Sequence, residues 1–140
     1  MPEARGTRGL LDTSVVIDLE RVDAASLPDE AALSALTMAE LAAGPHATND
    51  PDERARRQER LQRAEATFAP LPFDANAARA YGRICAAISA QGRKARGRRA
   101  IDLLIAATAL AETLPLYTRN PEEFRGLGDL VEIRVVEAAE

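Results

Sequence analysis

The chain has 140 residues, of which 46% are hydrophobic and 29% charged, so it is long enough and apolar enough to fold around a buried core. Aromatic residues make up only 4% and tryptophan is absent, so that core must be mainly aliphatic. The net charge of −4 argues against binding nucleic acid through overall charge alone, although basic residues are concentrated in two short blocks.

No apolar run approaches the roughly 20 residues of a membrane-spanning helix, and no adequate signal-peptide apolar region precedes the first acidic residues. The single cysteine, Cys85, excludes an internal disulfide and suits a reducing compartment. These features predict a cytoplasmic protein without a membrane anchor. We expect residues 1–140 to form a single domain, with residues 1–7 as a loose leader.

The first predicted unit is a strand over residues 8–11 followed by a helix over residues 14–21, with Thr13 or Ser14 as its N-cap. Asp12 stands between them, at the carboxyl end of a buried strand, which is where open α/β sheets bind ligands. From its position alone, Asp12 can be a helix cap, a buried hydrogen-bond acceptor or a metal ligand.

The second unit is a short strand over residues 31–34 or 31–36, followed by a helix over residues 37–43. Thr37 and Glu40 have the spacing of a capping box, in which the glutamate bonds back to the start of its own helix. Glu40 can equally point into the same cleft as Asp12, because both roles place it beside the end of a strand. The sequence leaves these two roles open.

The middle of the chain is predicted to be helical, apart from one short strand. A charged helix over residues 52–68 precedes a strand over residues 69–73, whose two prolines restrict it to the edge of a sheet. Asp74 then caps a long helix through Gln91, which buries one apolar face.

The last part of the chain begins with a basic segment over residues 92–99. An almost wholly apolar helix follows over residues 100–110, with Asp102 in its first turn. Three further elements complete the chain: a strand over residues 115–118, a loop entering a short helix over residues 119–124, and a strand over residues 130–136. This alternation of strands and helices predicts a parallel sheet with helices on both faces.

Three acidic residues therefore occupy equivalent places, since Asp12, Glu40 and Asp102 each stand where a strand ends or a helix begins. In a parallel sheet these places meet at one edge, which residues 118–123 also reach. Two carboxylates about 5 Å apart repel each other by roughly 3 kcal/mol at an effective dielectric constant of about 20. Such a cluster would take up protons or attract cations. Its oxygen ligands favour a hard cation, Mg²⁺ or Mn²⁺, which binds phosphates and can activate water for in-line attack.

Four segments resemble the PIN-domain family, and most closely the VapC-type toxins of bacterial type II toxin–antitoxin pairs. They are LLDTSVVIDL at residues 10–19, LTMAELAAG at 36–44, DLLIAATAL at 102–110 and LYTRNPEEFRGLGDL at 116–130. In this order and spacing the resemblance covers nearly all of the chain. It implies an α/β protein, a three-layer α/β/α sandwich with a central, mostly parallel sheet.

The resemblance also implies a Mg²⁺- or Mn²⁺-dependent endoribonuclease that hydrolyses phosphodiester bonds in RNA and so inhibits translation or growth. By motif match the metal site consists of Asp12, Glu40 and Asp102, and Asn120 stands at a catalytic position where many relatives have a fourth aspartate. Supporting roles fall to one acid and three hydroxyl side chains that match the family pattern: Glu123, Thr13, Ser14 and Thr118. We expect cleavage to leave 5′-phosphate and 3′-hydroxyl ends.

The resemblance further implies a cognate VapB-type antitoxin, an RNA substrate and a homodimer. We expect the basic loop before Asp102 to hold RNA phosphates through five side chains: Arg93, Lys94, Arg96, Arg98 and Arg99. The arginines of residues 54–63 stay undecided between RNA, the antitoxin and pairing with glutamates of their own helix.

A different class of function is a catalytically weak PIN-like module that binds RNA or protein, and Asn120 in place of an acid is the main argument for it. Two other proteins with aspartates at a sheet edge fit less well. A phosphoryl-accepting receiver domain needs adjacent acids after its first strand, where this chain has Leu11 before Asp12. A haloacid-dehalogenase-like phosphatase needs a second aspartate at the position of Ser14.

Overall fold

The computed structural model describes residues 7–93 and 98–140, and a parallel sheet forms its centre. Within these residues the sheet has four strands in the order β2-β1-β3-β4: β1 (Arg8–Leu11), β2 (Glu30–Leu33), β3 (Leu116–Thr118) and β4 (Ile133–Val135). All pairings are parallel, and Leu10 lies opposite both Ala32 and Leu116. The carboxyl ends of the strands therefore meet at one edge of the sheet.

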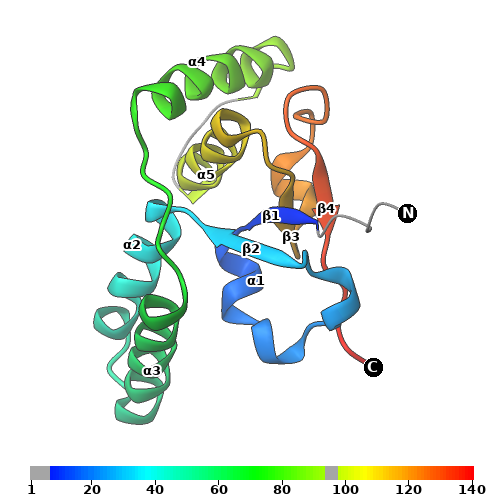
Figure 1. Ribbon diagram of the computed structural model, residues 1–140. Helices are drawn as coiled ribbons and strands as arrows, with labels where there is room; N and C mark the ends of the chain where they lie inside the picture. The colour runs from blue at the N-terminus through cyan, green and yellow to red at the C-terminus, as the bar shows by residue number, and fades with distance from the viewer. Residues whose placement is uncertain (1–6, 94–97) are drawn as a thin grey trace.

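Helices connect the strands and cover both faces of the sheet (Figure 1). In the described part of the chain the α-helices are α1 (Thr13–Ile17), α2 (Ala35–Ala43), α3 (Pro51–Thr67), α4 (Ala75–Ala90) and α5 (Arg98–Glu112). Short 3₁₀ turns lie between them: η1 (Leu19–Arg21), η2 (Ala24–Ser26), η3 (Gly44–Ala47) and η4 (Pro121–Phe124). None of the described helices is both long and apolar enough to cross a lipid bilayer.

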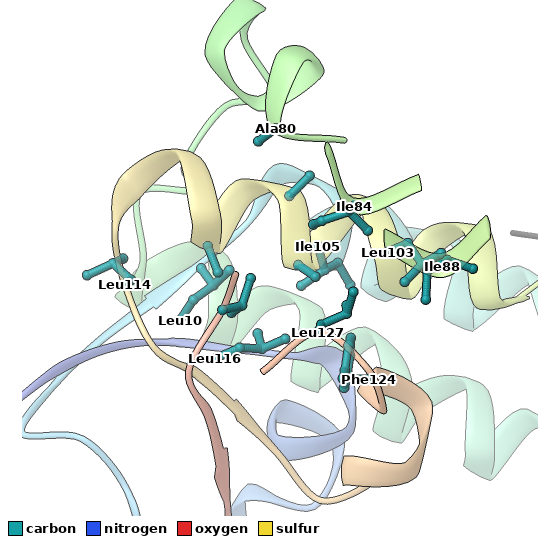
Figure 2. Packing of buried hydrophobic residues seen from close by; sticks show 14 residues of the cluster. Leu10, Ala80, Ile84, Ile88, Leu103, Ile105, Leu114, Leu116, Phe124 and Leu127 are labelled. Atoms are coloured by element: carbon teal, nitrogen blue, oxygen red, sulfur yellow. The ribbon is translucent and has the colours of Figure 1, made fainter. Parts of the chain in front are cut away.

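Two hydrophobic clusters lie on opposite faces of the sheet, because alternate side chains of a strand point to opposite sides. Leu10 and Leu116 pack against α4 and α5 on one face, where Figure 2 shows them with Ile84, Ile105 and Leu127. The other cluster joins strand residues to α1, α2 and α3: Leu11, Leu33, Tyr117, Val15, Val16, Leu41 and Ala64. The predicted three-layer α/β/α fold with a parallel sheet is confirmed.

The predicted strand over residues 69–73 is wrong. Leu71 makes only an isolated bridge to Ser34, in which its amide donates to the Leu33 carbonyl at 2.8 Å and its carbonyl accepts from the Ala35 amide at 2.8 Å. The prolines on either side of Leu71 have no N–H to extend the ladder. The segment therefore touches the end of β2 at one residue.

Two predicted helix caps are also wrong, each by one or more residues. The Asp12 carboxylate itself caps α1, where it accepts from the Val15 amide at 3.3 Å, so neither Thr13 nor Ser14 is the cap. The Ser34 hydroxyl caps α2 by accepting from the Thr37 amide at 3.0 Å. Thr37 lies inside the helix, because β2 ends at Leu33 and α2 begins two residues earlier than predicted. The capping box of Thr37 and Glu40 is therefore not formed.

Other element boundaries differ more simply from the prediction. Helix α1 ends at Ile17 and continues as η1, and β4 begins at Ile133 rather than at Leu130. Helix α5 begins at Arg98, so Asp102 lies beyond the first turn, where the helix dipole helps a carboxylate less. The cap predicted at Asp74 is confirmed, because its carboxylate accepts from the Ala77 amide at 3.0 Å.

Gly9 offers a test of how closely β1 packs against β3. A Cβ atom at Gly9 would overlap the buried ring of Tyr117 and lie 3.3 Å from Pro28 Cβ. We expect Gly9→Ala to lower the free energy of unfolding by about 1–3 kcal/mol, the usual cost of overpacking, in urea unfolding experiments. Gly82→Ala is the control, because Gly82 is exposed in α4 with open space around it. This control should raise the free energy of unfolding by up to about 1 kcal/mol, and equal stabilities of wild type and Gly9→Ala would contradict the packing.

Candidate active site

A cleft of about 520 Å³ opens at the carboxyl edge of the sheet. It is lined by six acids and two arginines, together with small, polar and apolar residues. The acids are Asp12, Asp18, Glu40, Glu53, Asp102 and Glu123, and the arginines are Arg57 and Arg60. Carboxylates far apart in the sequence thus face one space, as the parallel topology predicts.

Asp12 lies at the base of this cleft and is only 4% exposed. Its amide donates to the Tyr117 carbonyl at 2.9 Å, which fixes the end of β1 against β3. Its carboxylate accepts from the hydroxyls of Ser14 at 2.5 Å and Thr118 at 2.6 Å, and from the Val15 amide at 3.3 Å. Burial raises the pKa of Asp12, while these hydrogen bonds act in the opposite direction.

Glu40 reaches the cleft through a chain of hydroxyl groups. Its Oε1 accepts from Thr13 Oγ1 at 2.5 Å, and the Thr13 and Thr37 hydroxyls lie 3.1 Å apart. Ser34 Oγ donates to Thr37 Oγ1 at 3.3 Å. Because Thr13 has one hydroxyl proton and gives it to Glu40, Thr37 must donate to Thr13. Of the two roles that the sequence left open, the structure therefore shows Glu40 facing the cleft and bonded to another unit of the fold.

The remaining predicted residues come from the second half of the chain. Asp102 projects from α5 and Glu123 from η4, and both are half-buried in the cleft wall. Asn120 lies between β3 and η4, where its backbone N–H donates to Thr118 Oγ1 at 2.9 Å. Thr118 itself is fully buried behind the cleft and does not line it. It connects Asp12 to the backbone that carries Asn120.

The cleft offers only oxygen ligands, which is the chemistry that Mg²⁺ and Mn²⁺ prefer. The Asp12 carboxylate is buried and accepts from two hydroxyls and a backbone amide, which are all neutral, so a nearby cation would stabilise its charged form. The donor chemistry therefore fits a divalent cation. In residues 7–93 and 98–140, however, no three acid, histidine or cysteine side chains are grouped closely enough to hold one metal ion together.

Comparison with known proteins identifies the family. The sequence matches the PIN domain over residues 9–130. The chain belongs to the PIN-domain family. Ribonuclease VapC5 of Mycobacterium tuberculosis (strain ATCC 25618 / H37Rv) is 35% identical over 131 residues, which cover 91% of this chain and 93% of the relative. Ribonuclease VapC of Rickettsia bellii (strain RML369-C) is 30% identical over 125 residues, which cover 86% of this chain and 91% of the relative.

Solved structures show the same relationship for this PIN domain. The crystal structure of VapBC-5 from Mycobacterium tuberculosis, a member of the VapBC family of toxin–antitoxin systems, matches with a TM-score of 0.80 and 35% identity. The match covers 94% of this chain and 98% of the chain in that structure. The resemblance to VapC proteins seen in the sequence is therefore confirmed.

Sequence reasoning missed four residues that line the cleft of this PIN domain: Asp18, Glu53, Arg57 and Arg60. Three of them lie on α3, whose arginines the sequence leaves undecided between RNA, the antitoxin and glutamates of their own helix, without placing any of them in the cleft. Their positions relative to Glu53 are i, i+4 and i+7, which place side chains on one helix face. That spacing is the signal that could have found them.

The basic loop before Asp102 remains a prediction as an RNA contact. Lys94 and Arg96 lie outside the described residues, as does the side chain of Arg98. Arg93 donates to the Arg125 carbonyl at 2.5 Å, and Arg99 Nη1 is buried without a hydrogen-bond partner. Neither Arg93 nor Arg99 lines the acidic cleft.

The raised pKa of Asp12 gives a testable pH dependence. Below its ordinary pKa of 3.8, Asp12 is protonated in both the folded and the unfolded protein. Above that value the folded protein holds the proton longer, so the free energy of unfolding falls as pH rises through the raised pKa and then levels off. Asp12→Asn removes this titration, so we expect wild type to lose stability relative to Asp12→Asn as the pH rises from about 4 to 7. Urea unfolding in EDTA across this range measures the difference, and a difference that does not change with pH, or that changes in favour of wild type as pH rises, would contradict it.

Thr118 gives a second test, because its hydroxyl donates to Asp12 and accepts from the Asn120 amide. Thr118→Val keeps the shape but removes a hydrogen-bond donor from the buried Asp12 carboxylate, so we expect a loss of about 1–3 kcal/mol of unfolding free energy. Thr108→Val is the matched control, because Thr108 is equally buried and its hydroxyl donates to the Leu104 carbonyl of its own helix rather than to a residue of the site. Thermal or urea unfolding that shows equal losses for both variants would contradict the role of Thr118.

Proposed function

We propose that this PIN domain is a Mg²⁺- or Mn²⁺-dependent endoribonuclease and the toxin of a VapBC-type toxin–antitoxin pair. The observation that carries the proposal is the convergence of Asp12, Glu40 and Asp102 on one cleft. The names of the similar proteins support it, since both VapC relatives are called ribonucleases.

In this proposal Asp12 and Asp102 hold the cation, directly or through water, and Glu40 either joins them or orients the attacking water. When bound, a divalent cation would polarise the scissile phosphate and stabilise its developing charge. Ser14 and Thr118 hold the Asp12 carboxylate in one orientation. Thr13 does the same for Glu40, so neither side chain has to search for its position during the reaction.

Asn120 and Glu123 complete the proposed site. The side-chain carboxamide of Asn120 carries no charge, so it can bind substrate or water without adding to the repulsion between the acids. Glu123 adds negative charge to the wall of the cleft. The products would be a 5′-phosphate and a 3′-hydroxyl end.

The proposed partner is a VapB-type antitoxin. The support comes from similar solved structures, which include VapBC-5 as a member of the VapBC family of toxin–antitoxin systems. An acidic cleft that attracts a metal ion also attracts a guanidinium group, so an arginine of the partner could occupy it. We further propose that the toxin acts on cytoplasmic RNA, inhibits translation or growth, and forms a homodimer.

A catalytically weak RNA- or protein-binding module is the second candidate. One observation favours it: among the described residues, the carboxylates of the cleft do not group closely enough for three of them to share a metal ion. Asn120 in place of a fourth acid points the same way. The two candidates differ in whether RNA is cut.

The test is incubation of total bacterial RNA with purified, antitoxin-free protein in Mg²⁺, in Mn²⁺ and in EDTA. We expect discrete fragments in the presence of either metal and none in EDTA. Glu40→Gln and Asp102→Asn should each lower the cleavage rate about a hundredfold or more, the scale of losing a positioned acid–base group. Asp129→Asn is the control, because Asp129 is exposed and does not line the cleft, and it should cleave at the wild-type rate.

Fragments that persist in EDTA would contradict the metal dependence. A folded protein that binds RNA and cuts none of it under any metal would favour the binding module. Mapping the fragment ends would name the target and show whether a 5′-phosphate is left.

A further inference from the structure

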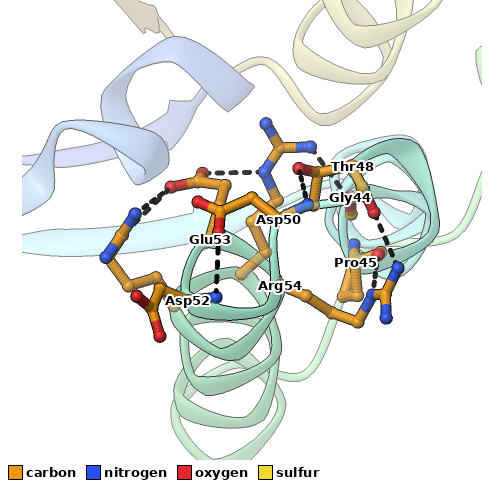
Figure 3. A network of polar contacts seen from close by, with 9 residues as sticks. Gly44, Pro45, Thr48, Asp50, Asp52, Glu53 and Arg54 are labelled. Atoms are coloured by element: carbon orange, nitrogen blue, oxygen red, sulfur yellow. Dashed lines mark hydrogen bonds and ion pairs between the residues drawn. The ribbon is translucent and has the colours of Figure 1, made fainter.

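The five arginines of α3 divide into two groups by what their guanidinium groups contact. Arg54 donates to the carbonyls of Pro45 at 3.1 Å and Thr48 at 2.8 Å, which ties α3 to η3 (Figure 3). Arg56 and Arg57 both pair with Glu53, at 2.8 Å each. These three side chains hold the start of the helix in place.

Arg63 is engaged as well, one turn before the end of the helix. It pairs with Glu20 at 2.6 Å and with Glu59 at 2.6 Å. Arg60 differs from the other four, because the described part of the chain offers it no hydrogen bond and no ion pair. It is half-buried and lines the cleft that contains Asp12 and Glu40.

The charge of the cleft explains why a free arginine matters there. Six carboxylates and two guanidinium groups line it, so a phosphodiester that enters meets net repulsion. Arg57 is already used, since it donates to Glu53 and, at 2.9 Å, to the Gly44 carbonyl. Hydrogen bonds from Arg57 and Arg56 lower the pKa of Glu53, in keeping with a committed ion pair. Among the described residues that line the cleft, Arg60 is therefore the cation whose N–H donors remain available for a ligand.

Arg60 also stands where the cleft meets a second hollow of about 320 Å³, between α1–η1 and α3. The two hollows share Ile17, Asp18 and Arg60, and Val16, Leu19 and Phe68 give the second one an apolar wall. An RNA strand that runs from the acids of the cleft into this hollow passes Arg60. A guanidinium group there can take two phosphate oxygens at once through paired N–H donors.

We propose that Arg60 binds a backbone phosphate of the RNA next to the phosphodiester held by the acids. The proposal rests on the RNA-binding part of the proposed function and deepens it. RNA is favoured over a protein partner as the ligand of Arg60, because a phosphate needs a cation beside these acids, whereas a partner's arginine drawn to the acids gains nothing from Arg60.

The experiment measures binding of a fluorescent single-stranded RNA by anisotropy at several salt concentrations, in an Asp12→Asn background that leaves the RNA uncut. We expect Arg60→Gln to weaken binding about tenfold, the scale of one charge-assisted hydrogen bond. The slope of log K against log salt should become shallower by about 0.7, the value for one phosphate contact on a single strand. Arg60→Lys should keep the slope and lose part of the affinity.

Arg79→Gln is the matched control, because it removes the same charge from an exposed position on α4, where Arg79 bonds to Asn76. It should change the affinity less than about twofold. A loss in Arg79→Gln as large as in Arg60→Gln, or RNA affinity of Arg60→Gln equal to that of its parent, would overturn the proposal. So would a parent that binds no RNA, or an Arg60→Gln variant that keeps RNA but releases a co-expressed protein partner.

Cleavage kinetics separate this proposal from the proposed function. With Asp12 intact and metal present, Arg60→Gln should raise KM about tenfold and leave kcat within about twofold, because the contact is the same in the ground and transition states. If wild type cleaves RNA and Arg60→Gln has the same KM and kcat, the role of Arg60 is overturned and the ribonuclease stands. If the protein binds RNA through Arg60 but cuts no RNA, the role of Arg60 is supported and the proposed ribonuclease activity is overturned.

Discussion

The buried carboxylate of Asp12 is the group on which the rest of this structure depends. It ends β1, caps α1 and takes a hydrogen bond from Thr118 at the end of β3, so three elements meet at one side chain. Burial disfavours the charged form of this carboxylate and so raises its pKa. The same cost makes it a strong site for positive charge, which connects the stability of the fold to the chemistry of the cleft.

The second constraint is the direction of the hydroxyl chain from Ser34 through Thr37 and Thr13 to Glu40. Each hydroxyl donates to the next, so the only acceptor at the end is a carboxylate oxygen. The chain fixes α2 against α1 and sets the position of Glu40 at the same time. A change of Thr13 to an apolar residue would therefore disturb packing and site together.

The sequence predicted the layers and the acids of the cleft but not every local contact. Alternating strands and helices sufficed for the parallel sheet, and the sheet placed Asp12, Glu40 and Asp102 at one edge. The caps of α1 and α2 were predicted wrongly because Ser34, Thr37, Asp12 and Thr13 are all good cap residues, and which one is used depends on where the strand stops. The strand at Leu71 failed because a single bridge next to prolines looks like a strand in sequence. The spacing of Glu53, Arg57 and Arg60 places these side chains on one helix face, but five arginines in ten residues give no hint of which one has no ion pair within the described part of the chain.

The hydrogen bond between Asp12 and Thr118 joins residues 106 positions apart. During synthesis Asp12 leaves the ribosome early, whereas Thr118 and Asn120 follow only when most of the chain has been made. Contacts of such long range form late in folding, because the loop between them must be ordered first. Helix α1, with five residues and a cap that needs β3 for its orientation, is too short to persist alone. A nascent chain therefore carries its acids apart, and the cleft is assembled only near the end of translation.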